Sequence, residues 1–194
     1  MTVPRQVPVR TQTSSCAVAC LLAAATLAGV GAAAQPSASA TLHACEGGAT
    51  IGTATFQERP SGEGIKLVDV EVRVEGSAMA EGPHAVHIHE TAACDPCGAA
   101  QGHFDPGPNS NTNPDGNHPF HSGDLVNLVV DAAGTGAMST TTSRVTVSPG
   151  PLSILDEDGS ALIIHVGADT YCPEGVVAGC AGGARAACGI IVAE

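Results

Sequence analysis

Histidines dominate the residues of this sequence that could do chemistry. Seven of the eight histidines lie between His84 and His165. Two of them, His87 and His89, flank Ile88 in an apolar run that is typical of a β-strand. Successive side chains of a strand point to opposite faces, so both imidazoles would share one face, as a pair of metal ligands must. A strand can also place two histidines on a solvated face, so the pair alone indicates a metal site only weakly.

A long loop follows this strand and adds further donors. Residues 91–124 are polar and rich in glycine, proline and asparagine, and they contain His103, His118, His121 and Asp124. Three histidines and a carboxylate can complete a tetrahedral zinc site without any cysteine. The alternative is a polar loop with incidental histidines. Loops of this length inside a compact domain are usually functional or disordered, and the clustered donors favour a functional loop.

His165 stands in a different setting, at the end of the strongly apolar run 160–166. An unpartnered histidine would be costly in such a buried strand. A satisfied core histidine is one interpretation. Because several other donors need partners, a metal ligand is the better hypothesis.

The elements that must position these side chains are mostly strands. The 194 residues include 24 glycines and 13 prolines, and short Val/Ile/Thr runs lie between them, which favours an all-β domain. The runs predict about eight strands, at 41–45, 49–58, 65–75, 85–90, 125–131, 135–142, 160–166 and 188–193. A change of apolar parity between Leu67 and Val68 indicates a bulge. We expect an eight-stranded Greek-key flattened barrel or sandwich with two long functional loops, 91–124 and 167–186.

The N-terminal region reads as a targeting segment. Two arginines precede a long, uncharged, alanine-rich stretch, and two A-x-A patterns end at Ala34 and Ala40. We therefore predict a signal peptide over 1–34, with cleavage as late as Ala40 as an alternative, and one domain over 41–194. An uncleaved membrane anchor is the competing interpretation.

Charge and cysteine content narrow the function classes. The formal net charge is −12, and every acidic residue lies beyond Ala40, so the sequence offers no basic stripe for nucleic acid. Export would place the six cysteines beyond the signal peptide in an oxidising compartment, where an even number suggests disulfides. Six cysteines can pair in 15 ways. These cysteines are Cys45, Cys94, Cys97, Cys172, Cys180 and Cys188. A redox or zinc pair at Cys94 and Cys97 is the alternative, but no second such pair accompanies it.

Five motifs, taken in order, resemble the successive signatures of copper/zinc superoxide dismutases of the bacterial, exported type. The motifs are His87-Ile88-His89-Glu90, Gly102-His103-Phe104-Asp105-Pro106, His121-Ser122-Gly123-Asp124-Leu125, Ile163-Ile164-His165 and Arg185-Ala186-Ala187-Cys188-Gly189. The resemblance implies a Greek-key barrel that binds one copper and one zinc per subunit. It also implies an enzyme that converts superoxide to molecular oxygen and hydrogen peroxide.

The resemblance further implies a role for each matched residue. The copper ligands would be His87, His89, His103 and His165, and the zinc ligands would be His103, His118, His121 and Asp124. His103 would bridge both metals and carry a proton during catalysis. Asp169 would link a copper-bound histidine to a zinc-bound one and so fix their ring orientation. Arg185 would attract and orient the superoxide anion beside copper.

The same resemblance bears on the cysteines. Cys188 matches one end of the disulfide of this family, with Cys94 as the favoured partner and Cys97 as the alternative. Cys172 and Cys180 are additional cysteines that could form an extra bridge.

The expected partner is the superoxide anion, with no nucleic acid and no stable membrane association after signal cleavage; a homodimer is allowed. The expected location is the periplasm, or the medium for a secreted protein. A non-enzymatic copper-binding or copper-delivery module on the same fold is the rival function. The full ligand set together with Asp169 and Arg185 favours the enzyme.

Overall fold

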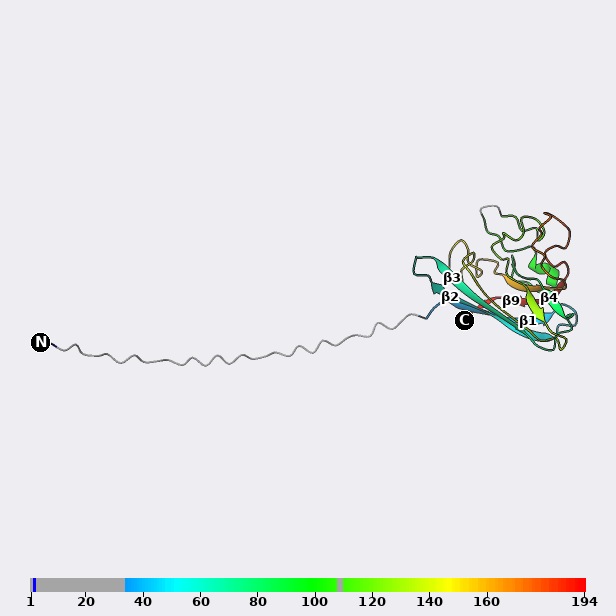
Figure 1. Ribbon diagram of the computed structural model, residues 1–194, viewed down its shortest axis with the longest axis horizontal. Helices are drawn as coiled ribbons and strands as arrows, with labels where there is room; N and C mark the ends of the chain where they lie inside the picture. Colours follow the sequence, from blue (N-terminus) through cyan, green and yellow to red (C-terminus); the bar gives the residue numbers. More distant parts are fainter. Residues whose placement is uncertain (1, 3–33, 108–109) are drawn as a thin grey trace. The chain divides into compact units, whose positions relative to one another are not determined.

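The computed structural model describes residue 2 and residues 34–107 and 110–194. Apart from Thr2 and Ala34, the predicted signal peptide lies outside these described residues. The described domain is built from strands and one short 3₁₀ helix, η1 (Figure 1). The elements are β1 (Ser37–Ala44), β2 (Thr50–Pro60), β3 (Lys66–Val74), β4 (Gly82–His84), β5 (Val86–His89), η1 (Cys97–Ala100), β6 (Leu128–Val130), β7 (Gly136–Thr142), β8 (Ala161–His165), β9 (Arg185–Ile190) and β10 (Val192–Ala193).

One antiparallel sheet contains all the strands, in the order β4-β6-β7-β3-β2-β1-β9-β8-β5, with β10 beside β1. The two end strands, β4 and β5, are separated only by Ala85. The N–H of Ala85 donates to Gly167 O at 2.9 Å, and its carbonyl accepts from the N–H of His165 at 2.9 Å. The segment 82–89 therefore joins both ends of the sheet and nearly closes it into a barrel, which leaves few free edges.

The strand count agrees with the prediction once interrupted strands are joined. β4 and β5 form one interrupted strand, and β9 and β10 form another, interrupted at Ile191. The ten strands then reduce to eight. β3 lies beside β7 although β4, β5 and β6 intervene in the chain, which is the Greek-key arrangement. The all-β prediction is confirmed.

Alternation of apolar and charged residues explains why β3 forms and which face it buries. The four valines at positions 68, 70, 72 and 74 are fully buried, whereas Asp69, Glu71 and Arg73 point away from the core. The predicted bulge between Leu67 and Val68 is wrong, because the pairing of β3 with β2 runs without a shift from Lys66 to Val74. Leu67 lies on the outer face, half-buried, so the inward parity does not change.

The first strand begins at Ser37, four residues before the predicted 41. Ala38 and Ala40 are buried inside the barrel, and β1 pairs there with β2 and with β10. Ala38 and Ala40, which resemble a cleavage pattern in the sequence, are therefore also the small inward-facing residues of β1.

Burial on both faces distinguishes β5 and β8 from the other strands. Val86 and Ile88 of β5 belong to the core, whereas His87 and His89 lie on the opposite face, and all four side chains are fully buried. In β8 the outer-face Ile163 packs under a cover that includes Ala100 and cysteines 45, 94, 97 and 188. Strands covered on both faces read as continuous apolar runs. The histidines of β5 thus lie on the outer wall of the barrel, beneath the loops.

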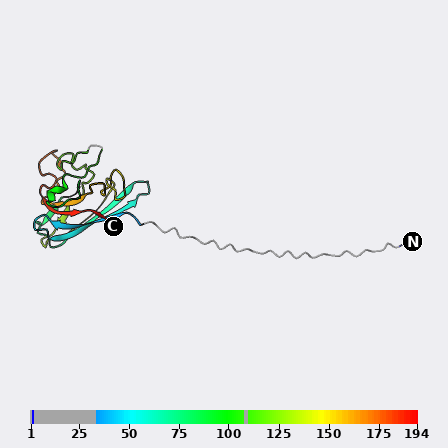
Figure 2. The same ribbon diagram turned by 180° about the vertical axis from the view of Figure 1, so that it is seen from behind.

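The cover is made by the two long loops, 90–127 and 166–184, which gather on the same side of the sheet in both views (Figures 1 and 2). Asp115 joins the loops, because its carboxylate accepts the N–H of Gly179 at 2.9 Å and the N–H of Ala181 at 3.2 Å. No helix in the described part of the chain is long and apolar enough to cross a membrane.

A buried carboxylate holds the connection between β7 and β8 against the barrel. Glu58 of β2 is 5% exposed and accepts hydrogen bonds of 2.8 Å from the backbone N–H groups of Val147 and Ser148. Lys66 lies 3.5 Å from the same carboxylate. Burial opposes ionisation of Glu58, but the bonds from Ser148 and Val147 and the charge of Lys66 outweigh it and lower its pKa.

We expect Glu58→Gln to lower the free energy of unfolding of the metal-free protein at pH 7 by about 1–3 kcal/mol, because charge-assisted hydrogen bonds are lost. The folded-state pKa is below the unfolded one, so the stabilisation is complete above the unfolded pKa and disappears as pH falls through the folded pKa. Urea unfolding between pH 7 and pH 3 should show the two proteins converging in acid. Glu63→Gln, at an exposed turn residue, is the matched control; an equal loss there would contradict the prediction.

We also expect a chain that starts at Thr41 to be less stable than one that starts at Gln35. The shorter chain loses the first half of β1 and the bonds from Glu58 N–H to Pro36 O and from Glu194 N–H to Ser37 O. Two such bonds amount to about 2 kcal/mol, or a Tm about 4–8 °C lower. Equal thermal melting curves for the two chains would contradict this prediction.

Candidate metal centre

Backbone hydrogen bonds attach the first long loop to the free edge of β5. The N–H of Ile88 donates to Gly123 O at 2.9 Å, and the carbonyl of Ile88 accepts from the N–H of Phe104 at 2.9 Å. The N–H of Gly123 donates in turn to Phe104 O at 2.8 Å. A Cβ on Gly123 would lie 2.3 Å from Ile88 O, so only glycine allows this close approach.

These bonds place four of the predicted site residues side by side. His87 forms a bridge with Asp124, and His89 forms one with His103, as if the loop were two further pieces of sheet. The four side chains are 0–1% exposed. Two donors from β5 and two from the loop therefore meet in one buried space because of backbone pairing.

The predicted copper ligands form one group. One nitrogen from each histidine lies within 4.8 Å of the others; the members are His87, His89, His103 and His165. The Nδ1 atom of His89 is 2.9 Å from Gln101 O, and that of His165 is 2.8 Å from Gly183 O, so these nitrogens carry the protons. Their Nε2 atoms are then unprotonated and only 3.3 Å apart. Two facing lone pairs repel each other unless a cation lies near both, which fits a metal.

Several buried ring nitrogens have no hydrogen-bond partner within the described residues. They are His87 Nδ1, His103 Nε2, His118 Nδ1 and His121 Nε2. Buried polar atoms are almost always satisfied in native proteins. Coordination of a metal would satisfy the atoms of His87, His103 and His118 that point into the two donor groups, so these donors fit metal ions better than they fit a metal-free core.

A carboxylate organises the second, predicted zinc group. The Oδ1 atom of Asp124 is 2.7 Å from His103 Nδ1, and its Oδ2 atom is 3.2 Å from His118 Nδ1 and 3.0 Å from His121 Nδ1. His103, His118 and Asp124 lie within 4.8 Å of one another together with His87, whereas His121 joins through Asp124 alone. His103 belongs to both groups, with Nδ1 toward Asp124 and its unpartnered Nε2 available to the first group.

A second carboxylate connects the two groups. The Nε2 atom of His87 is 3.1 Å from Asp169 Oδ2, and that of His118 is 2.7 Å from the same oxygen. Asn127 brackets Asp169, accepting its N–H at 2.8 Å and donating to its carbonyl at 3.0 Å. The N–H of Tyr171 donates to Asp169 Oδ1 at 2.6 Å. Asp169 is therefore fixed by its own backbone neighbours and orients one ring of each group.

The electrostatics of the two groups differ. Burial lowers the pKa of His87 to about 3 and that of His165 to about 4, so both rings are neutral and able to bind a metal near pH 7. Burial also lowers the pKa of His118, but its close contacts with the Asp124 and Asp169 carboxylates outweigh this and raise the pKa to about 9. Burial opposes ionisation of both carboxylates, yet their histidine partners hold the pKa values of Asp124 and Asp169 well below normal.

Arg185 places a positive charge beside the first group. Its guanidinium donates to the carbonyls of Cys97 and Gln101, and Gln101 O also accepts from His89. Half-burial lowers the pKa of Arg185, but an arginine remains a cation at physiological pH. Its charge contributes to the lowered pKa values of His89 and His165.

Three disulfides brace the loops around the site. They join Cys45 to Cys97, Cys94 to Cys188 and Cys172 to Cys180. The first two hold the segment that carries the Cys97 and Gln101 carbonyls. Sequence reasoning offered no partner for Cys45, because spacing along the chain does not reveal which loops meet. Asn127 was also missed, since one asparagine in a polar stretch carries no signal of its own.

His84 lies apart from both groups, although it belongs to the same histidine-rich region. Its Nδ1 is 2.8 Å from His165 O and its Nε2 is 2.8 Å from Ala80 O. It holds the backbone behind His165 and offers no nitrogen to either group.

Comparisons with known proteins agree with this geometry. The family model described as "Copper/zinc superoxide dismutase (SODC)" matches residues 50–191. A superoxide dismutase [Cu-Zn] of Deinococcus radiodurans is 37% identical over 160 residues, which is 75% of this chain and 79% of that protein. One from Legionella pneumophila is 36% identical over 143 residues, 73% of this chain and 77% of that protein.

A solved structure shows the same fold. The double mutant of a SOD-like protein from Bacillus subtilis has a TM-score of 0.58 and 31% sequence identity, and the match covers 78% of this chain and 95% of that chain. The match of the family model spans every predicted ligand as well as Arg185. The structure gathers the donors into two adjoining groups that both include His87 and His103, with His121 beside Asp124. The chain therefore belongs to the copper/zinc superoxide dismutase family.

Proposed function

We propose that the protein disproportionates superoxide: two superoxide anions and two protons give one molecular oxygen and one hydrogen peroxide. The observation that carries the proposal is the pair of buried donor groups that share His103 and contain unpartnered ring nitrogens. A copper ion in the first group supplies the one-electron redox couple that this reaction requires, and a zinc ion in the second is redox-inert.

We assign the ligands from the nitrogens that the protein leaves free or turns toward each group. Copper would be held by His87 Nδ1, His89 Nε2, His103 Nε2 and His165 Nε2. Zinc would be held by the Nδ1 atoms of His103, His118 and His121 and by the Asp124 carboxylate. His118 contacts both carboxylates, Asp124 through Nδ1 and Asp169 through Nε2. Asp169 also contacts His87.

The chain itself supplies the anion site and a proton site. Arg185 attracts superoxide because its charge is permanent; two backbone carbonyls hold its guanidinium, and its charge acts on His89 and His165. The single lone pair of His103 Nε2 could take a proton destined for peroxide only while it does not bind copper, and Asp124 would keep the other ring nitrogen in place. The surrounding loops bury His87, His89 and His103 completely and so keep bulk water away from the ligands.

The same proposal places the protein outside the cytoplasm, in the periplasm or the medium. Three disulfides within the described residues support this location, because disulfides persist mainly in oxidising compartments.

The first test uses the chain from Gln35, loaded with copper and zinc, with metal content and superoxide consumption measured on one sample. We expect about one ion of each metal per chain, and loss of activity in His165→Ala because a copper ligand is removed. His43→Ala, at an exposed histidine, should keep both metals and activity. Tight copper binding by the unmodified chain without turnover would contradict the enzyme and leave a copper-binding module.

We further expect Asp169→Asn to weaken zinc binding by about 10–100-fold, because the outer partner of His118 loses its charge. Chelator competition on the metal-free protein measures this affinity directly. Glu174→Gln is the matched control, since Glu174 is exposed in the same loop. Equal zinc affinities in the two variants would show that Asp169 does not orient the ligand.

A further inference from the structure

The segment Pro119–Asp124, called here the zinc segment, carries two of the proposed zinc ligands without lying in a helix or strand. Within the segment, the N–H of His121 donates to Asp124 Oδ2 at 2.9 Å and that of Asp124 to His121 O at 3.3 Å, and the N–H of Phe120 donates to Asn117 O at 2.9 Å. Its C-terminal end is attached to β5 through Gly123, whereas Phe120 is 73% exposed. Something outside the segment must therefore hold its exposed end.

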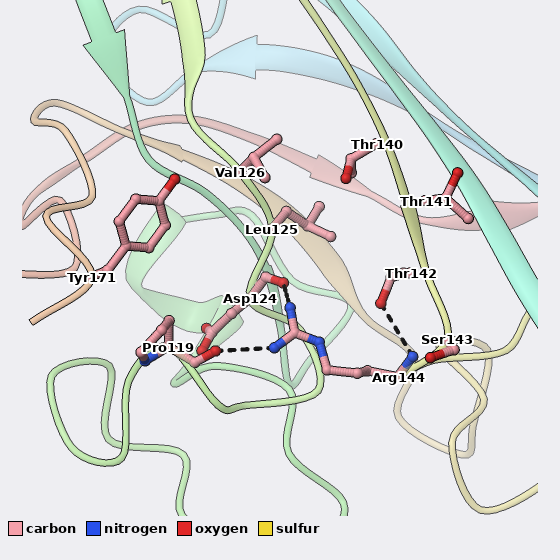
Figure 3. Close-up of a pocket in the computed structure, with 10 residues that line it drawn as sticks. All are labelled: Pro119, Asp124, Leu125, Val126, Thr140, Thr141, Thr142, Ser143, Arg144 and Tyr171. Atoms are coloured by element: carbon pink, nitrogen blue, oxygen red, sulfur yellow. Dashed lines mark hydrogen bonds between the residues drawn. The ribbon is translucent and has the colours of Figure 1, made fainter.

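Arg144 makes that contact from a different part of the chain. It lies two residues after the end of β7, and its N–H donates to Thr142 Oγ1 at 3.1 Å, which anchors its backbone to the barrel. Its guanidinium reaches the zinc segment and donates to Pro119 O at 3.0 Å and to Asp124 O (Figure 3). One rigid, planar group thus joins the first and last residues of the segment.

The contact has the properties of a clamp. Both bonds come from an ionised donor, and such bonds are stronger than bonds between neutral groups. The five described cations beyond residue 34 have different partners: Arg59 pairs with Asp69, Lys66 with Glu58 and Arg73 with Glu71, while Arg185 and Arg144 bind backbone carbonyls. Among them, the one that contacts the zinc segment is Arg144.

Asp124 is consequently fixed at both its main chain and its side chain. Its carbonyl accepts from Arg144, while its carboxylate faces His103, His118 and His121. A shift of the backbone at Asp124 would move the carboxylate relative to all three rings. A residue that fixes this backbone therefore controls the geometry of the second group and has no contact with the first.

We propose that Arg144 is a positioning residue for zinc, which holds the zinc segment in its metal-binding arrangement before zinc arrives. The inference rests on the zinc assignment proposed above. It goes beyond that assignment because Arg144 is no ligand and acts only through the carbonyls of Pro119 and Asp124.

The surroundings of Arg144 make a chemical rescue feasible. Arg144 lines an open groove of about 420 Å³, together with Leu125, Val126 and Tyr171 (Figure 3). Arg144 is exposed, so truncation to alanine leaves a solvent-accessible space beside the two carbonyls. Free guanidinium ion has the same planar donor geometry and can enter that space.

The experiment compares the unmodified chain with Arg144→Ala, Arg144→Lys and Arg73→Ala, all prepared without metal. Zinc affinity is measured by chelator competition, copper affinity in the same way, and the zinc-site geometry by the absorption spectrum of bound Co(II). We expect Arg144→Ala to lose about 10–100-fold in zinc affinity, as for other residues that orient ligands. Copper affinity should fall much less than zinc affinity, because His103 is the one copper ligand that Asp124 contacts. Arg144→Lys should recover only part of the loss, because lysine cannot span both carbonyls.

Millimolar guanidinium chloride should restore zinc affinity to Arg144→Ala and have no effect on Arg73→Ala, whose arginine is 68% exposed on the side chain and pairs with Glu71. Equal zinc affinity in Arg144→Ala and Arg73→Ala would overturn the proposal. So would an equal loss of zinc and copper affinity without rescue, which would indicate general misfolding. If the unmodified chain binds no zinc, the zinc assignment itself fails, which is a different result from a failure of Arg144 alone.

Discussion

The burial of uncharged imidazoles on the outer face of β5 is the constraint on which the rest of the structure depends. One face of this strand completes the barrel core through Val86 and Ile88, so the strand cannot turn away from the wall. His87 and His89 must then lie on the other face, where they are fully buried. Burial keeps their pKa values low and the rings neutral, as metal binding requires. Burial also requires other residues to cover this face of β5, and the two long loops provide them.

The cover is held by backbone hydrogen bonds and by disulfides. Backbone bonds at Ile88 attach the loop that carries His103 and Asp124, and disulfides attach the loop that carries the Arg185 partners. These interactions fix the loops from which the donor side chains project. The ring nitrogens that stay without a protein partner in this buried space are the atoms that metal ions would satisfy.

The carboxylates of Asp124 and Asp169 orient different histidine rings. Asp124 faces three histidines of one group, and Asp169 joins that group to the other through His118 and His87. Their negative charges favour a cation in the second group, whereas Arg185 brings a positive charge to the first, where an anionic substrate is needed. The two groups thus share His103 but differ in charge. The negative second group suits a structural cation, and the first group, near Arg185, suits redox chemistry with an anion.

The sequence by itself determined the all-β fold and the eight-strand count, because strand alternation is a local property. It predicted the residues of both donor groups through the resemblance of its motifs to a known family. Alternation misplaced one bulge, since Leu67 is apolar yet faces outward under partial cover. Tertiary structure alone decided what covers β5, which cysteine meets Cys45, and that Asn127 and Arg144 bind the backbones of Asp169 and Asp124. Those contacts join residues separated by long loops, and their formation depends on barrel closure, which no local pattern encodes.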